Sequence, residues 1–187
     1  MTSMADRMLR AARLDATLYE EVEADTSAMR QATLVVVLAS VAGGIGTAGE
    51  FGGPSAIGFV VGAIVSLIGW YLWSLITYLV GTRLLPQPST QADLGQLLRT
   101  LGFASSPGLV RALGIIPGVG PFALAVGMLW TLAAMVVAVR QALDYDSTGR
   151  AIAVCAIGWL VQVAVVLIPM MLLGFALGGA ADSGAAA

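Results

Sequence analysis

Long apolar runs, separated by short segments that hold almost all of the charge, are the feature that most constrains how this 187-residue chain can fold. Hydrophobic residues make up 58% of the sequence and charged residues only 11%, which is more apolar than a water-soluble domain of this length needs. A helix needs about 20 predominantly apolar residues to cross a bilayer. The sequence therefore predicts an all-α, polytopic integral membrane protein.

Five segments are predicted to cross the membrane: 31–49, 56–80, 97–118, 122–143 and 151–177. The third is the least regular, because Pro107 and Pro117 interrupt it. It can cross only as a helix broken by proline or enter as a re-entrant element. The predicted organisation is a cytoplasmic N-terminal segment (1–30), a five-span membrane domain (31–179) and a flexible tail (180–187).

The arginines give this topology an orientation. All nine basic residues are arginines, and eight of them lie outside the apolar cores of the spans: Arg7, Arg10, Arg13, Arg30, Arg83, Arg99, Arg140 and Arg150. Five crossings from a cytoplasmic N-terminus place all eight on the cytoplasmic side and leave Glu50 and Asp182 outside, as the positive-inside rule requires. If 97–118 did not cross, the last two arginines would fall on the opposite side. The C-terminus is then expected in the periplasm, because the lysine-free composition indicates a bacterial inner membrane.

The first thirty residues are predicted to contain one amphipathic helix, over 3–24. Its apolar face could lie on the membrane surface with the arginines drawn to anionic lipid, or the helix could be solvated; the sequence leaves both open. An acidic cluster follows from Glu20 to Asp25 and is interpreted as a solvated face, with Asp25 or Thr26 capping the next helix. A signal peptide needs an apolar run that this segment lacks, so we expect the N-terminus to be retained.

Arg111 is the ninth arginine and lies inside the third span. A charge at membrane depth costs about 2.5–3.5 kcal/mol on insertion scales, so such residues pair, face an interior or mark an ion path. The favoured interpretation is structural: a contact with Glu50, or with the outer headgroups through the long arginine side chain. The alternative is a role in transport, with Gly102 and Pro107 forming the break beside it.

The residue inventory argues against most catalysis. The chain has no histidine and only one cysteine, Cys155, which excludes a Cys/His metal site and an intrachain disulfide. The commonest general base is therefore missing, and we expect no enzyme, no metal and no cofactor. A net charge of -2 and a pI near 4.9 give no sign of nucleic-acid binding.

A series of short motifs extends across half the chain. It comprises Gly81-Thr82-Arg83-Leu84-Leu85, Leu98-Arg99-Thr100-Leu101-Gly102-Phe103-Ala104 with Pro107 after it, Ile115-Ile116-Pro117-Gly118-Val119-Gly120, Leu129-Trp130, Val139-Arg140-Gln141-Ala142-Leu143 and Thr148-Gly149-Arg150-Ala151. In this series, from Trp70 to Trp159, the chain resembles the Yip family of Ypt-interacting membrane proteins. The resemblance implies five spans with a cytoplasmic N-terminus.

The same resemblance implies a class of function. Eukaryotic relatives associate with Rab-type GTPases and act in vesicle trafficking and membrane shaping. For this chain we expect a non-enzymatic interaction, scaffold or membrane-organising protein. It could act as an accessory subunit of a larger membrane complex. Its expected partners are the lipid bilayer and a membrane protein or a second copy. The alternative is a small-solute or ion transporter or channel built around the broken third span, since interrupted helices can form binding sites at mid-membrane.

Overall fold

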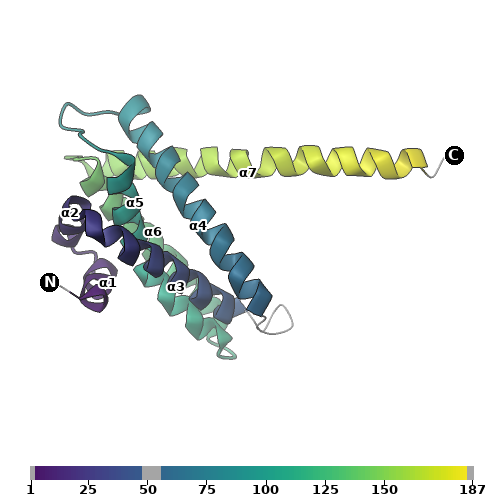
Figure 1. The fold of residues 1–187 in the computed structure, drawn as a ribbon, viewed down its shortest axis with the longest axis horizontal. Helices are drawn as coiled ribbons and strands as arrows, with labels where there is room; N and C mark the ends of the chain where they lie inside the picture. Colours follow the sequence, from purple (N-terminus) through teal and green to yellow (C-terminus); the bar gives the residue numbers. More distant parts are fainter. Residues whose placement is uncertain (1–2, 48–55, 185–187) are drawn as a thin grey trace.

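The computed structural model describes residues 3–47 and 56–184, and within them every regular element is helical. The elements, shown in Figure 1, are α1 (Met4–Ala12), α2 (Ala16–Ala24), the short 3-10 helix η1 (Thr26–Ala28), α3 (Met29–Thr47), α4 (Ala56–Leu79), the π-helical turn η2 (Val80–Leu84), α5 (Leu94–Ala104), the 3-10 helix η3 (Ser106–Ile115), α6 (Gly120–Ala142) and α7 (Thr148–Gly184). The predicted all-α class is confirmed. α7 covers part of the predicted tail, whose last three residues lie outside the described ones.

Four helical segments are each long and apolar enough to cross a membrane: Thr26–Thr47, Ala56–Leu84, Gly120–Ala142 and Thr148–Val165. They coincide with four of the five predicted spans. Their outward surfaces are apolar, with exposed side chains such as Ile57 on α4 and Phe122 on α6. This is the distribution expected of helices whose solvent is lipid. The chain is a multi-pass membrane protein.

The third predicted span is divided between α5 and η3, neither of which reaches the length of a crossing by itself. Together they follow α3 in the same direction along its length. Gly102 of α5 packs on Ala32 near the start of α3, and Gly114 of η3 packs on Gly46 near its end. α6 then returns beside η3. The count of five crossings stays a prediction, which this parallel course supports.

Pro107 explains where the third span breaks. Proline has no backbone N–H and clashes with the carbonyl four residues earlier, which here belongs to Phe103. The Ser106 hydroxyl donates to that carbonyl at 2.7 Å, and the Ser105 hydroxyl donates to the carbonyl of Leu101 at 3.3 Å. The carbonyls that the break would leave unpaired are thereby satisfied, as an apolar environment demands. The ten residues of η3 form an unusually long 3-10 helix.

The N-terminal segment differs from the prediction of one helix over 3–24. It forms α1 and α2, which together we call the N-terminal hairpin (residues 4–24). The turn places Leu14 at φ 62°, and the Asp15 side chain then accepts from the backbone N–H of Thr17 and caps α2. The apolar side chains of Leu18, Tyr19 and Val22 are fully buried against the bundle, so this face lies on protein rather than on lipid, and the cytoplasmic placement of the segment stays a prediction.

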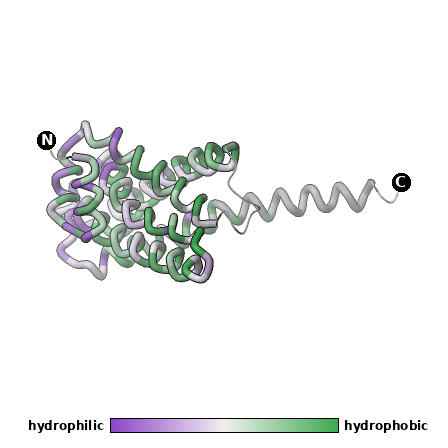
Figure 2. The backbone as a smooth tube through the Cα atoms, turned by 90° about the horizontal axis from the view of Figure 1, so that it is seen from below, coloured by the Kyte–Doolittle hydropathy of each residue, from purple (hydrophilic) through white to green (hydrophobic). Residues whose placement is uncertain are grey.

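Hydrophilic residues gather at one end of the molecule, beside the N-terminus (Figure 2). Two loops meet there, one between η2 and α5 and the other between α6 and α7. The Tyr145 hydroxyl donates to the carbonyls of Gly81 at 3.0 Å and Leu85 at 2.7 Å, and Arg150 donates to the carbonyl of Pro86 at 2.9 Å. Asp93 caps α5 in a capping box with Gln96. This end is therefore a fixed platform rather than a set of loose loops.

Candidate functional site

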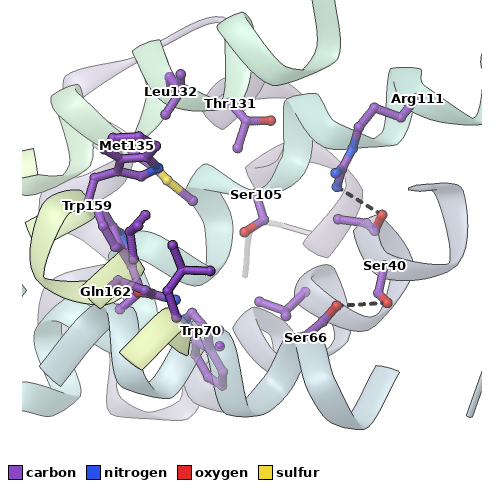
Figure 3. A pocket seen from close by; sticks show the side chains of 16 residues that line it. Ser40, Ser66, Trp70, Ser105, Arg111, Thr131, Leu132, Met135, Trp159 and Gln162 are labelled. Carbon is purple, nitrogen blue, oxygen red and sulfur yellow. Dashed lines mark hydrogen bonds between the residues drawn. The ribbon is translucent and has the colours of Figure 1, made fainter. Parts of the chain in front are cut away.

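A cavity of about 660 Å³ lies inside the helical bundle, beside the broken span. α3, α4, α6 and α7 supply its walls from the middle of each helix, and Ser105 at the break joins them. Figure 3 shows Arg111 at one side of this cavity and Trp159 and Gln162 at the opposite side. Its volume falls within the range of roughly 300–1,000 Å³ typical of small-ligand sites.

Arg111 reaches the cavity by turning back along the bundle. Its backbone lies against Gly46, near the end of α3, while its Nη2 donates to the carbonyl of Ala39 at 3.2 Å. Seven residues of helix separate Gly46 from Ala39, or about 10 Å. The side chain therefore extends toward the middle of the bundle, away from the end of α3. The predicted contact with the outer headgroups stays a prediction, which this direction does not favour.

Backbone carbonyls, rather than a carboxylate, hold the Arg111 guanidinium in the part of the chain that the structure describes. Nε donates to the carbonyl of Gly108 at 3.1 Å and Nη2 to that of Ala39. Two carbonyls offset part of the free-energy cost of desolvating the cation, but they do not neutralise its charge. Glu50, the predicted partner, lies outside the described residues, so an Arg111–Glu50 contact stays a prediction.

Glycines make room for this arrangement. A Cβ at Gly46 would overlap the Arg111 carbonyl oxygen, and one at Gly127 of α6 would lie 2.6 Å from the Arg111 Cγ. A Cβ at Gly43 would be 3.5 Å from the guanidinium carbon. The glycine-rich end of α3 thus lets η3 approach backbone to backbone, as small residues do between membrane helices.

The other predicted site residues have separate places. Gly102 is buried in the α3–α5 contact, where a Cβ would lie 2.7 Å from that of Ala32. Pro107 is buried at the start of η3. Pro117 lies in the turn before α6, on a smaller cavity of about 220 Å³ that Arg111 does not line. Of the predicted site residues that the structure describes, only Arg111 lines the large cavity.

The sequence did not reveal the rest of the cavity wall. Trp70 and Trp73 of α4 both line the cavity, and Trp70 Nε1 donates to the carbonyl of Leu98 at 3.1 Å. Ser40 and Ser66 are joined across α3 and α4 by a hydrogen bond of 2.9 Å. Because α4 is apolar all round, its sequence carries no signal for the inward face.

The second candidate site is the N-terminal hairpin. Arg7 pairs with Glu21 at 2.9 Å and with Asp25 at 2.8 Å, so the acidic cluster is only partly the solvated face that was predicted. Hydrogen bonding to Ser27 and Arg7 lowers the pKa of Asp25, and bonding to Arg10 and Thr17 lowers the pKa of Asp15 to about 2. These carboxylates therefore stay charged at any physiological pH.

Side chains of α5 and α6 donate hydrogen bonds that fasten the hairpin to the bundle. Buried Arg99 of α5 donates to the carbonyls of Val22, at 2.9 Å, and Glu23, at the C-terminal end of α2. A cation is favourable there because the helix dipole is negative at that end. Trp130 of α6 donates to the carbonyl of Ala12, the last residue of α1, at 2.7 Å. Each helix of the hairpin is thus held by its C-terminal end.

Comparison with known families gives one match, to the Yip1 domain, over residues 17–180. The matched region begins in α2 and extends through the broken span and the cavity into α7. No curated protein and no solved structure matches the chain.

Proposed function

Because the chain belongs to the Yip1-domain family, we propose that it is a non-enzymatic interaction protein of the inner membrane, which presents its N-terminal hairpin to a membrane-protein partner. The supporting observation is that the hairpin is held rigidly. Ion pairs lock its two helices together, and Arg99 and Trp130 fix it to the membrane domain. A preorganised surface spends less binding free energy on ordering than a flexible tail does.

The outward face of the hairpin is chemically mixed, which suits a partner surface. Leu9 is 50% exposed on α1, with Asp6 and Arg13 exposed on the same helix and its turn, and Glu20 exposed on α2. An exposed leucine among charges is typical of a small docking surface with a polar rim. This surface supports the proposed scaffold role, in which the protein acts as an accessory subunit of a larger membrane complex.

Photo-crosslinking in intact membranes tests the proposal. A photoreactive residue at Leu9 should give one discrete crosslinked product, whereas the same residue at Ile57, which is exposed near the N-terminal end of α4, should not. Arg99→Leu should abolish the product, because it releases the hairpin while leaving the surface of α1 intact. A product that persists in Arg99→Leu, or the absence of any product at Leu9, would contradict a role for the docked hairpin.

The cavity is the specific observation that favours the alternative function, transport of a small solute or ion through the broken span. Flux in vesicles should then fall in Arg111→Ala while the protein remains folded. Lost folding without any measurable flux in the wild type would exclude transport. The matched control is Arg83→Ala, which removes an exposed charge at the polar end of the molecule.

A further inference from the structure

The large cavity opens toward the lipid rather than toward water. Leu132 of α6 and Trp159 and Leu167 of α7 line it, and all three side chains are about half exposed on the outside of the bundle. A molecule dissolved in the bilayer can reach this opening without leaving the apolar phase. The cavity therefore selects first for an apolar or amphiphilic occupant.

Among the described residues, the wall of the cavity carries one cation, Arg111, together with a few neutral polar side chains. The hydroxyls of Ser66, Ser105 and Thr131 each donate within the protein, to Ser40, Leu101 and Gly127 respectively. Arg111 has five N–H groups, of which Nε and Nη2 supply the two described bonds. Among the described residues, two buried polar atoms of the wall have no hydrogen-bond partner, the donor Trp73 Nε1 and the acceptor Gln162 Oε1. The charge of the wall is that of Arg111, whose N–H groups beyond the two described bonds can receive an anionic acceptor.

The remaining wall is apolar and aromatic. Trp70, Met135 and Trp159 lie across the cavity from Arg111 (Figure 3). Val36, Trp73 and Val163 also line it. One cation at one side and a long apolar surface leading from it match a molecule with a charged head and a single alkyl chain. The guanidinium fork suits a carboxylate, which it can hold through two parallel hydrogen bonds.

We infer that this cavity binds a single-chain anionic amphiphile, a fatty carboxylate, with its head on Arg111 and its chain along the tryptophan-lined wall toward α7. Arg111 is then the recognition residue, and Ser40 and Thr131 border the head. The inference does not depend on the interaction function proposed above, because it uses no residue of the N-terminal hairpin.

The tryptophans provide the measurement. The protein is reconstituted in phosphatidylcholine vesicles and titrated with a dibrominated stearate, whose bromines quench tryptophan fluorescence on contact. Binding in the cavity should give quenching that saturates, above the linear quenching from probe dissolved in the bilayer. The dibrominated alcohol of the same chain length, which has no charge, should bind at least about tenfold more weakly, because it loses a charge-assisted hydrogen bond.

Four variants distinguish binding at a specific site from simple partition of the probe into the bilayer. Arg111→Gln should weaken saturable binding at least about tenfold, and Arg111→Lys should restore part of it. Arg83→Gln removes a charge far from the cavity and should leave binding unchanged. Gly69→Phe should abolish saturable quenching, because Gly69 lines the cavity and a Cβ there meets nothing within 4 Å.

Circular dichroism and gel filtration establish that each variant is folded. Gly69→Phe keeps the test decisive even if Arg111→Gln does not fold, since it fills open space and leaves the charge in place. Equal quenching by the acid and the alcohol, or saturable quenching that survives Gly69→Phe, would overturn the inference. Saturable binding of the alcohol with the affinity of the acid would show a lipid groove without head recognition.

Discussion

At the scale of single residues, glycine decides how closely the broken span approaches its neighbours. Gly46 and Gly114 meet backbone to backbone, and a Cβ on Gly114 would lie 2.8 Å from the Gly46 carbonyl oxygen. Gly69 has the opposite environment, because it faces the cavity. Substitution by alanine at Gly46 and at Gly69 should therefore have opposite effects on the stability of the protein.

We predict that Gly46→Ala destabilises the protein by about 1–3 kcal/mol, because the added methyl forces α3 and η3 apart. Gly69→Ala should be neutral or stabilise by up to about 1 kcal/mol, since alanine is the better helix former and meets no neighbour. Thermal unfolding of both variants in one detergent measures the difference. Equal losses would mean that the α3–η3 contact is not as close as described.

At the scale of elements, the sequence predicts where the membrane spans lie but not which side of each helix faces the inside of the bundle. Four of the spans could be predicted because their length and hydropathy suffice, and Pro107 marked the break in the remaining one, the third. The hairpin could not be predicted, because the turn at Leu14 carries neither glycine nor proline and interrupts a helical pattern. The cavity could not be predicted either, since it depends on which side of an evenly apolar helix faces inward.

Docking of the N-terminal hairpin should depend on pH through Glu23. Burial and the negative charges of Asp144, Glu20 and Asp93 raise the pKa of Glu23 to about 7, against the opposing effect of Arg99. A raised pKa means that the docked state favours the protonated carboxyl. The stabilisation is complete below the ordinary pKa of 4.5 and is lost as the pH rises through 7.

We therefore predict that amide hydrogen exchange in α1 and α2, corrected for its intrinsic pH dependence, becomes faster relative to α3 between pH 5 and 8. Glu23→Gln should remove this change, whereas Glu20→Gln, at an exposed position of the same helix, should retain most of it. An unchanged pH profile in Glu23→Gln would assign the effect to another group. The Asp15 and Asp25 ion pairs do not compete, because their carboxyl pKa values are lowered.

At the scale of the whole molecule, the arginines and the course of the broken span agree on one topology. Arg99, Arg140 and Arg150 all take part in contacts at the polar end, with the N-terminal hairpin or with the loops there. The turn at 116–119 lies beyond the far end of η3, near Gly46. Five crossings place these two ends on opposite sides of the membrane.

Single-cysteine labelling tests this arrangement. In a Cys155→Ala background, a membrane-impermeant maleimide should label Val119→Cys from the outside of intact cells and Asp146→Cys only after permeabilisation. Both positions are exposed, so accessibility within the protein does not distinguish them. Labelling of both cysteines from the same side would show that residues 97–118 do not cross, and would reduce the number of spans.

The divided third span also sets an order for biogenesis. Neither α5 nor η3 is long enough to leave the translocation channel and enter lipid by itself. They pack on α3, and η3 packs on its glycine-rich end. We therefore expect α3 to insert first. We expect α5, η3 and α6 to insert afterwards as one unit, in which α6 supplies the hydrophobicity that α5 and η3 lack. Ribosomal synthesis would have to pass Ala142 before the third span is committed to the bilayer.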